Sequence, residues 1–178
     1  MPELLLRDAT AADSDAIAAL HADSWRRNYR GAYPDDYLDG EVFAERQRVW
    51  AERLAAPDGG AFTVVADGDG AVIGFAHTIL DADPELGALL DNLHVTHDRK
   101  REGIGAQLMA ETARRLTALR PGSGLYLGVL EQNTAAQAFY TARGGAPTGP
   151  ARMEPVEGGG AASCFTYAWP VSELHRLA

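Results

Sequence analysis

The sequence predicts an α/β fold, because segments in which every second residue is apolar, as in strands, alternate with segments of helical periodicity. The expected order is one strand, two helices, three strands, a helix, a strand, a helix and two strands. A strand–helix–strand unit lies in the middle, and a right-handed crossover makes its two strands parallel neighbours. The 178 residues, 46% of them hydrophobic, can bury one core, so we expect a single domain over residues 1–178.

The first third of the sequence predicts a short strand followed by two helices. Residues 4–7 are apolar enough for the strand. Residues 10–13 have the spacing of a capping box, which opens a helix that we expect to end near Asn28. The aromatic and glycine-containing run at residues 29–34 breaks the helical pattern, and a second helix is expected over residues 42–54.

Two hairpins are expected on either side of the central unit. Their four strands are residues 62–66, 71–80, 153–156 and 164–169. Asp67-Gly68-Asp69-Gly70 is a strong turn signal for the first hairpin. Gly158-Gly159-Gly160 marks the turn of the second, and an acidic loop at residues 81–85 leads from the first hairpin to the central unit.

The central unit is the stretch around which the fold is organised. It predicts a buried strand at residues 90–95, a helix from 104 to about 119, a strand at 125–130 and a helix that Asn133 caps and that ends near Arg143. The first helix leaves its initial N–H groups unpaired, with the positive end of its dipole in the preceding turn. Gly103 and Gly105 let a ligand approach that backbone, and Arg99, Lys100 and Arg101 add three cations. This combination predicts an anion site, best suited to a diphosphate.

Other interpretations of the turn follow from the residues alone. A Gly-x-Gly connection with solvated basic residues is the simplest of them. A dinucleotide-binding fold would need a third glycine where Leu108 stands and an acidic residue at the end of the next strand. A P-loop would need Gly-x-x-x-x-Gly-Lys-Ser/Thr, which the sequence does not contain. Neither of these nucleotide-binding folds fits.

Residues 95–106 resemble the acetyl-CoA-binding motif of the GCN5-related N-acetyltransferases (GNAT): arginine or glutamine, two residues, glycine, one residue, then glycine or alanine. Here the motif is Lys100-Arg101-Glu102-Gly103-Ile104-Gly105, with Arg101 where many members carry glycine. The order of elements is also that of the family. The resemblance implies a GNAT fold, with a central mixed, mostly antiparallel sheet of six to seven strands, helices on both faces, and two parallel strands that splay apart at the acetyl-CoA cleft.

A second motif that resembles the family runs from Asn133 through Ala136 to Phe139 and Tyr140. In the family, the asparagine hydrogen-bonds the pantetheine arm and the tyrosine lies near the thioester sulfur. Gly145 departs from the pattern, because phenylalanine commonly follows the preceding glycine. Together the motifs imply that acetyl-CoA contacts Leu93, His94, Val95, Lys100, Arg101, Glu102, Gly103, Ile104, Gly105, Ala106, Asn133, Ala136, Phe139 and Tyr140.

The reaction that the resemblance implies is acetyl transfer from acetyl-CoA to a primary amine by direct attack in a ternary complex. Such an amine, with a pKa near ~10.4, must lose a proton before it attacks. An amide of the strand that holds Leu93 and Val95 would stabilise the oxyanion, and Tyr140 is the candidate acid that protonates the leaving thiolate. The alternative is a non-catalytic acyl-CoA-binding or sensing domain, which would not need Tyr140.

The candidates for the general base are Asp91 and His94. His94 has a suitable ordinary pKa, near ~6.5, whereas Asp91 would need desolvation or an intervening water. Strand alternation places the two on opposite faces unless a bulge intervenes. Ordered water without a side-chain base is an equal alternative. His97 could join both in a metal site, but no set of cysteines and histidines completes a tetrahedral site, so no metal is expected.

The acceptor pocket is expected beside the loop between the first two helices, as in similar proteins. This resemblance places Asn28, Tyr29, Tyr33, Pro34 and Asp36 at the pocket. Substrate-binding roles are expected for Tyr29 and Tyr33, and for Asn92 on the strand at residues 90–95. Aromatic rings suit an ammonium group. Trp25 and Trp50 fit better in the core. The acceptor can be a small-molecule or a peptide amine.

Composition narrows the partners and the compartment. A formal net charge of −9 argues against nucleic acid as a partner. The single cysteine, Cys164, excludes an internal disulfide and suits a reducing compartment. The N-terminal apolar run is too short for a signal peptide, and no stretch is long enough for a membrane span. We therefore expect a cytoplasmic protein without membrane association. Homodimers are frequent in the family, although no residue here marks an interface.

Overall fold

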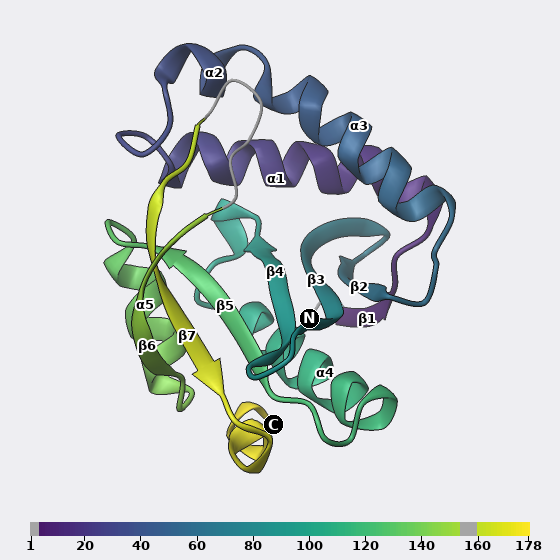
Figure 1. Cartoon of the computed structure of the whole chain (residues 1–178). Helices are drawn as coiled ribbons and strands as arrows, with labels where there is room; N and C mark the ends of the chain where they lie inside the picture. Colours follow the sequence, from purple (N-terminus) through teal and green to yellow (C-terminus); the bar gives the residue numbers. More distant parts are fainter. Residues whose placement is uncertain (1–3, 154–159) are drawn as a thin grey trace.

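The computed structural model describes residues 4–153 and 160–178. Its centre is a seven-stranded sheet with the strand order β1-β2-β3-β4-β5-β7-β6 (Figure 1). All neighbouring strands are antiparallel except β4 and β5, which are parallel. Helices α1 and α3 lie on one face of the sheet and α4 and α5 on the other (Figure 1). The predicted fold class is confirmed.

The strands are β1 (Leu4–Asp8), β2 (Ala61–Gly68), β3 (Ala71–Asp83), β4 (Gly87–Val95), β5 (Leu125–Leu130), β6 (Ala146–Arg152) and β7 (Ser163–Trp169). The helices are α1 (Ser14–Asn28), α2 (Asp35–Asp39), α3 (Val42–Ala55), α4 (Ile104–Leu119) and α5 (Thr134–Ala142). Short 3₁₀ helices occur at Ala11–Asp13, His97–Arg99 and Val171–Leu177.

The closing hairpin contains a strand that was not predicted. Strand β6 lies at Ala146–Arg152, whereas the predicted strand was residues 153–156; Met153 is not in a strand, and residues 154–156 and most of the predicted turn fall outside the described residues. β6 contains Pro147 and Pro150, and proline is rare inside a sheet. β6 is the last strand of the sheet, however, and an edge strand tolerates proline because one side of its backbone has no ladder partner. The predicted acidic loop is also shorter, since β3 continues to Asp83.

Two hydrophobic clusters pack against the sheet from opposite sides. Under α1 and α3, Trp50 and Phe75 are fully buried with their rings 5.1 Å apart. Under α4, Leu108 and Leu116 are fully buried at helical spacing, as the periodicity predicts. Replacing an aromatic residue such as Trp50 with alanine would lower the free energy of unfolding by about 3–5 kcal/mol. These clusters fix α1 and α4 on either side of β4.

Trp169 accounts for the departure at Gly145. A Cβ atom at Gly145 would lie 2.6 Å from a ring carbon of Trp169, which is fully buried. The indole Nε1 of Trp169 also donates to the carbonyl oxygen of Arg143 at 2.9 Å. The indole therefore fills the space beside α5 and requires glycine at position 145.

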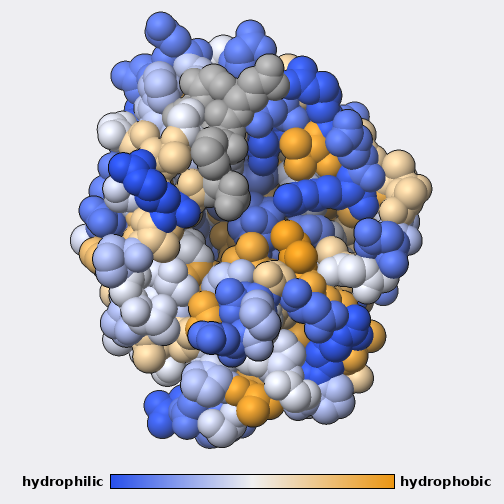
Figure 2. Space-filling model, viewed as in Figure 1, coloured by the Kyte–Doolittle hydropathy of each residue, from blue (hydrophilic) through white to orange (hydrophobic). Residues whose placement is uncertain are grey.

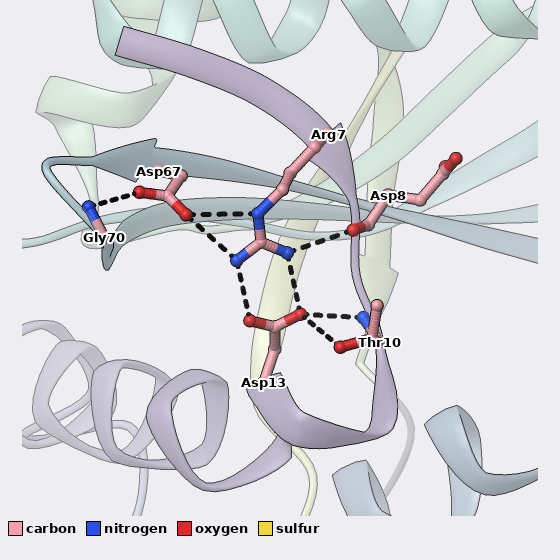
Figure 3. A network of polar contacts seen from close by, with 6 residues as sticks. All are labelled: Arg7, Asp8, Thr10, Asp13, Asp67 and Gly70. Carbon is pink, nitrogen blue, oxygen red and sulfur yellow. Dashed lines mark hydrogen bonds and ion pairs between the residues drawn. The ribbon is translucent and has the colours of Figure 1, made fainter. Parts of the chain in front are cut away.

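A polar network ties β1 to the start of α1 and to the β2–β3 turn (Figure 3). Arg7 donates to both carboxylate oxygens of Asp13 at 2.9 Å and to Asp67 at 3.1 Å. The other oxygen of Asp67 accepts from the Gly70 amide at 2.8 Å. Asp13 also accepts from the amide of Thr10, which completes the predicted capping box. Arg7 holds the pKa of Asp13 down, at about 2.

Helices α1 and α3 cover only part of their face of the sheet, since some side chains on it are half-buried. Figure 2 shows hydrophobic residues gathered in the middle of this side of the molecule. In the strand register, Ile79 of β3 pairs with Leu89 of β4, which pairs with Tyr126 of β5, so these three half-buried side chains form a row across the sheet.

Candidate active site

The parallel strands β4 and β5 separate soon after they meet. They pair only at Ala88 with Leu125 and at Leu89 with Tyr126, although β4 continues to Val95 and β5 to Leu130. Beyond these pairs, β4 remains paired with β3, and β5 remains paired with β7. A cavity of about 590 Å³ opens between the separated ends.

The cavity is lined by residues from α1, β4, the β4–α4 turn, β5 and α5, and by Met153. They are Ser24, Asn28, Tyr29, Leu90, Asp91, Asn92, Leu93, His94, Val95, Arg99, Lys100, Arg101, Gly103, Ile104, Gly105, Ala106, Leu127, Gly128, Val129, Leu130, Asn133, Ala135, Ala136, Phe139, Tyr140, Arg143 and Met153. All predicted cofactor-contacting residues except Glu102 are in this set. The carboxylate of Glu102 instead accepts from Arg99 at 2.7 Å.

The β4–α4 turn presents a run of unpaired backbone donors. The amides of Arg99 and Lys100 donate to residues of the preceding turn, and the amide of Gln107 donates to the Gly103 carbonyl. The six amides between them, at residues 101–106, have no acceptor among the described residues. They precede or open α4, whose dipole adds positive potential at the same point.

The turn reaches this shape through two left-handed residues. Arg101 has a φ of +71° and Gly103 a φ of +83°. A left-handed conformation costs a residue with a side chain about 1–2 kcal/mol. Glycine at the position of Arg101 would avoid this cost. A Cβ atom at Gly103 would meet nothing within 4 Å, so only the backbone conformation requires glycine there.

Asn133 lies across the cavity from this turn, at the start of α5. Its Oδ1 accepts from the Ala136 amide at 3.1 Å, and this bond caps the helix. The cap uses the oxygen and leaves the Nδ2 group of Asn133 without a partner among the described residues. The side chain therefore presents a fixed N–H donor at the wall of the cavity.

Tyr140 has a buried ring and an unbonded hydroxyl. Its ring packs against those of Phe139 and Trp169, at 5.3 and 6.1 Å between centroids. The hydroxyl forms no hydrogen bond with any described residue, and Tyr140 lines the cavity. Burial raises the pKa of Tyr140 to about 12, so the hydroxyl is protonated at neutral pH.

A bulge in β4 decides how the candidate bases are arranged. In the ladder with β3, His77 pairs with Asn92 and Thr78 pairs with Leu90, so Asp91 is an extra residue. Asp91 and Asn92 both contact Arg53 of α3, at 2.9 and 3.0 Å. The bulge therefore turns the Asp91 side chain toward the face of the sheet on which Asn92 and His94 lie. Strict alternation would have placed Asp91 on the opposite face.

His94 is held by α1. Its Nδ1 lies 2.8 Å from Oγ of Ser24, which accepts a bond from Asn28 at 3.3 Å. Desolvation, with help from the charges of Lys100 and Arg46, lowers the pKa of His94 to about 3. The imidazole is therefore neutral at pH 7. Asp91, in contrast, is ion-paired with Arg53.

The two predicted acceptor tyrosines differ in position. Tyr29 lines the cavity and stacks on Trp25 at 4.9 Å, whereas Tyr33 is 4% exposed and lies behind it in a hydrophobic cluster. Asn92 lines the cavity and is 9% exposed. Trp25 is in the core, as expected.

Several lining residues were not predicted as site residues. Ser24 lines the cavity from α1, and nothing in the sequence connects its helix face to β4. Asn28, four residues later on the same helix, was expected at the acceptor pocket and does line the cavity. Arg143 and Met153 line the cavity from the end of α5 and from just after β6.

Residues 4–153 and 160–178 contain no group of three or more histidine, cysteine, aspartate or glutamate side chains that could hold a metal ion. Within the same ranges, every helix falls short of the length and apolarity that crossing a membrane requires.

Comparison with known proteins identifies the family. Residues 20–145 match the family model described as the acetyltransferase (GNAT) family. The uncharacterised N-acetyltransferase YuaI of Bacillus subtilis is 34% identical over 140 residues, which are 77% of either chain. The probable N-acetyltransferase Rv2775 of Mycobacterium tuberculosis is 27% identical over 138 residues, 76% of this chain and 75% of its own length.

Solved structures share the fold at lower identity. The PaiA N-acetyltransferase of Thermoplasma acidophilum, in complex with coenzyme A, superposes with a TM-score of 0.75 at 19% identity, over 94% of this chain and 99% of its own. YncA of Salmonella typhimurium, with acetyl-CoA, superposes with a TM-score of 0.67 at 17% identity, over 95% and 94%. With the family model over most of its length and a relative above 30% identity, the chain belongs to the GNAT family of acetyltransferases.

Proposed function

We propose that this acetyltransferase transfers the acetyl group of acetyl-CoA to a primary amine of a small molecule or peptide, by direct attack while both substrates are bound. One observation carries the proposal. A single cavity is lined by five of the six residues whose amides lack an acceptor among the described residues, by Tyr140 with its unbonded hydroxyl, and by the polar residues His94 and Asn92. A diphosphate at one end and an amine at the other would bring a thioester and its attacker together between β4 and β5.

The residues of the turn suit the diphosphate of CoA. Six N–H donors, Lys100 and Arg101 would stabilise its negative charge. The Nδ2 group of Asn133 would donate to an amide carbonyl of the pantetheine arm. The separated edge of β4 supplies backbone N–H groups for the acetyl carbonyl, where charge develops as the amine attacks.

His94 and its neighbours would receive the amine. Because His94 is neutral, it can accept a hydrogen bond from the amine or from a water that removes the amine's proton. Its low pKa makes it a weak base by itself, so we assign proton removal to water oriented by His94. Asp91 contributes negative potential, but its pairing with Arg53 argues against a role as the base.

Tyr140 would assist the departure of the thiolate. Its hydroxyl is protonated and has no competing partner among the described residues, so it can donate a hydrogen bond to the sulfur as negative charge develops. Cys164 does not fit a covalent mechanism, because it is 2% exposed, does not line the cavity and has a pKa that burial raises. These features favour direct transfer.

A panel of amines tests the proposal. Purified protein is mixed with acetyl-CoA and each of several polyamines, aminoglycosides, amino acids and peptides, and free thiol and acetylated product are measured together. We expect at least one amine to yield both in equal amounts, and Tyr140→Phe to slow the reaction. Tight CoA binding without product from any amine would favour an acyl-CoA-binding or sensing domain.

A further inference from the structure

Arg143 places a guanidinium at the cavity from the C-terminal end of α5. Its Cζ atom lies 3.8 Å from the centroid of the Phe139 ring, and its Nη1 donates to the Phe139 carbonyl at 3.3 Å. Phe139 itself packs against the phosphate-binding turn, since a Cβ atom at Gly105 would lie 3.4 Å from its ring. Phe139 thus holds the guanidinium next to the N-terminus of α4.

No carboxylate among the described residues pairs with Arg143. Many arginines of this acidic chain form ion pairs, including Arg99, which lines the same cavity and pairs with Glu102. Arg143 has no carboxylate partner among the described residues, and neither do Lys100 and Arg101. Three cations without carboxylate partners therefore meet at one cavity of a protein whose formal net charge is −9.

Two anionic groups of CoA can account for these cations. Lys100 and Arg101 belong to the turn whose amides would take the diphosphate. Arg143 comes from a different element, and its planar fork matches a phosphate monoester, which carries about −1.5 to −2 charges and three acceptor oxygens. CoA has such a monoester on its ribose, and dephospho-CoA lacks it.

We propose that Arg143, stacked on Phe139, binds the ribose 3′-phosphate of CoA and makes the enzyme discriminate against dephospho-CoA. This inference rests on the proposed use of acetyl-CoA. The stacking limits the conformations of the guanidinium before the ligand arrives, so less entropy is lost on binding. Arg143 would then be a specificity residue, without any part in the chemical step.

Equilibrium binding tests the assignment without turnover. The dissociation constants of CoA and dephospho-CoA are measured by calorimetry for the wild type and for Arg143→Met, which keeps an apolar chain over Phe139. Arg114→Met on α4 is the matched control, because Arg114 is exposed and lies ten residues from the turn, about 15 Å along the helix. Thermal melting of each variant checks that it is folded.

We expect the wild type to bind CoA about tenfold more tightly than dephospho-CoA, as one charge-assisted interaction allows. Arg143→Met should lose most of this preference through weaker CoA binding, while its affinity for dephospho-CoA changes less than about twofold and Arg114→Met keeps the preference. Equal weakening of both ligands, or a wild type without any preference, would overturn the assignment of Arg143 alone. A wild type that binds neither ligand would overturn the proposed function as well.

Discussion

Replacing Tyr140 with phenylalanine removes one hydroxyl and little else. The hydroxyl forms no hydrogen bond with any described residue, so no protein donor or acceptor loses a partner. The ring contacts with Phe139 and Trp169 remain. We therefore expect the free energy of unfolding to change by less than about 0.5 kcal/mol. Any effect on turnover can then be attributed to the lost hydroxyl.

The expected size of that effect follows from the pKa. Burial raises the pKa of Tyr140 to about 12, whereas a thiol titrates near ~8.5, so complete proton transfer to the thiolate would be uphill by roughly 3.5 units, or about 5 kcal/mol. The hydroxyl then acts as a hydrogen-bond donor to a charged sulfur, which is worth about 1.5–3 kcal/mol. This predicts that Tyr140→Phe lowers kcat by roughly 10- to 150-fold.

The assay is thiol release at saturating acetyl-CoA and amine, with the affinity for acetyl-CoA measured separately. Tyr167→Phe is the matched control, because its ring lies 6.2 Å from that of Tyr140 but Tyr167 does not line the cavity. We expect the control to keep its activity and both variants to bind acetyl-CoA normally. If kcat of Tyr140→Phe stays within threefold of the wild type, the hydroxyl has no role in departure of the thiolate.

The other predictions concern the β4–α4 turn, the buried histidines and the Arg7 network. Arg101→Gly should keep CoA affinity, measured by calorimetry, within about threefold, because backbone amides supply most of the donors. Gly103→Ala, at a φ of +83°, should lower the free energy of unfolding by about 1–2 kcal/mol in urea. A Gly103→Ala variant as stable as the wild type would contradict the account of the turn. As the pH is lowered from 6.5 to 4, the free energy of unfolding should fall by up to about 4 kcal/mol per pH unit. Burial lowers the pKa of His77 to about 4, that of His94 to about 3 and that of His21 well below its ordinary value, so the unfolded chain binds more protons in this range; pH-independent urea midpoints would refute this. Above pH 4, Asp13→Asn should lower the free energy of unfolding by about 2 kcal/mol, which corresponds to a drop of roughly 4–8 °C in Tm. This difference should shrink as the pH falls toward 2, where the wild-type carboxyl group is also becoming protonated. An unchanged Tm would show that the Arg7 network does not stabilise the fold.

The β4–α4 turn could be predicted because its properties are local. Glycines at 103 and 105 and a helix start at Ile104 are readable in the sequence, and the structure places unpaired amides where helix geometry requires them. The N-cap role of Asn133 could be predicted for the same reason. Helical periodicity likewise gave α1, α3 and α4 to within about two residues.

What escaped prediction depends on contacts between distant segments. Nothing near Asp91 marks it as the extra residue of a bulge, because the bulge exists only in register with β3. Arg53 is 38 residues away from Asp91 in the sequence, and the packing of α3 brings the two together. Ser24 reaches His94 only because α1 crosses β4. Strand β6 was missed since its prolines are tolerated only at an edge, which the sequence does not reveal.

Amide chemical shifts test the central claim most directly. In a ¹⁵N-labelled sample, CoA is titrated while the backbone signals of residues 101–106 are followed. A bound diphosphate should move the proton signals of these amides downfield together, at a midpoint equal to the calorimetric dissociation constant. If CoA binds and these six signals stay in place while others move, the diphosphate lies elsewhere and the proposed arrangement of the cavity is wrong.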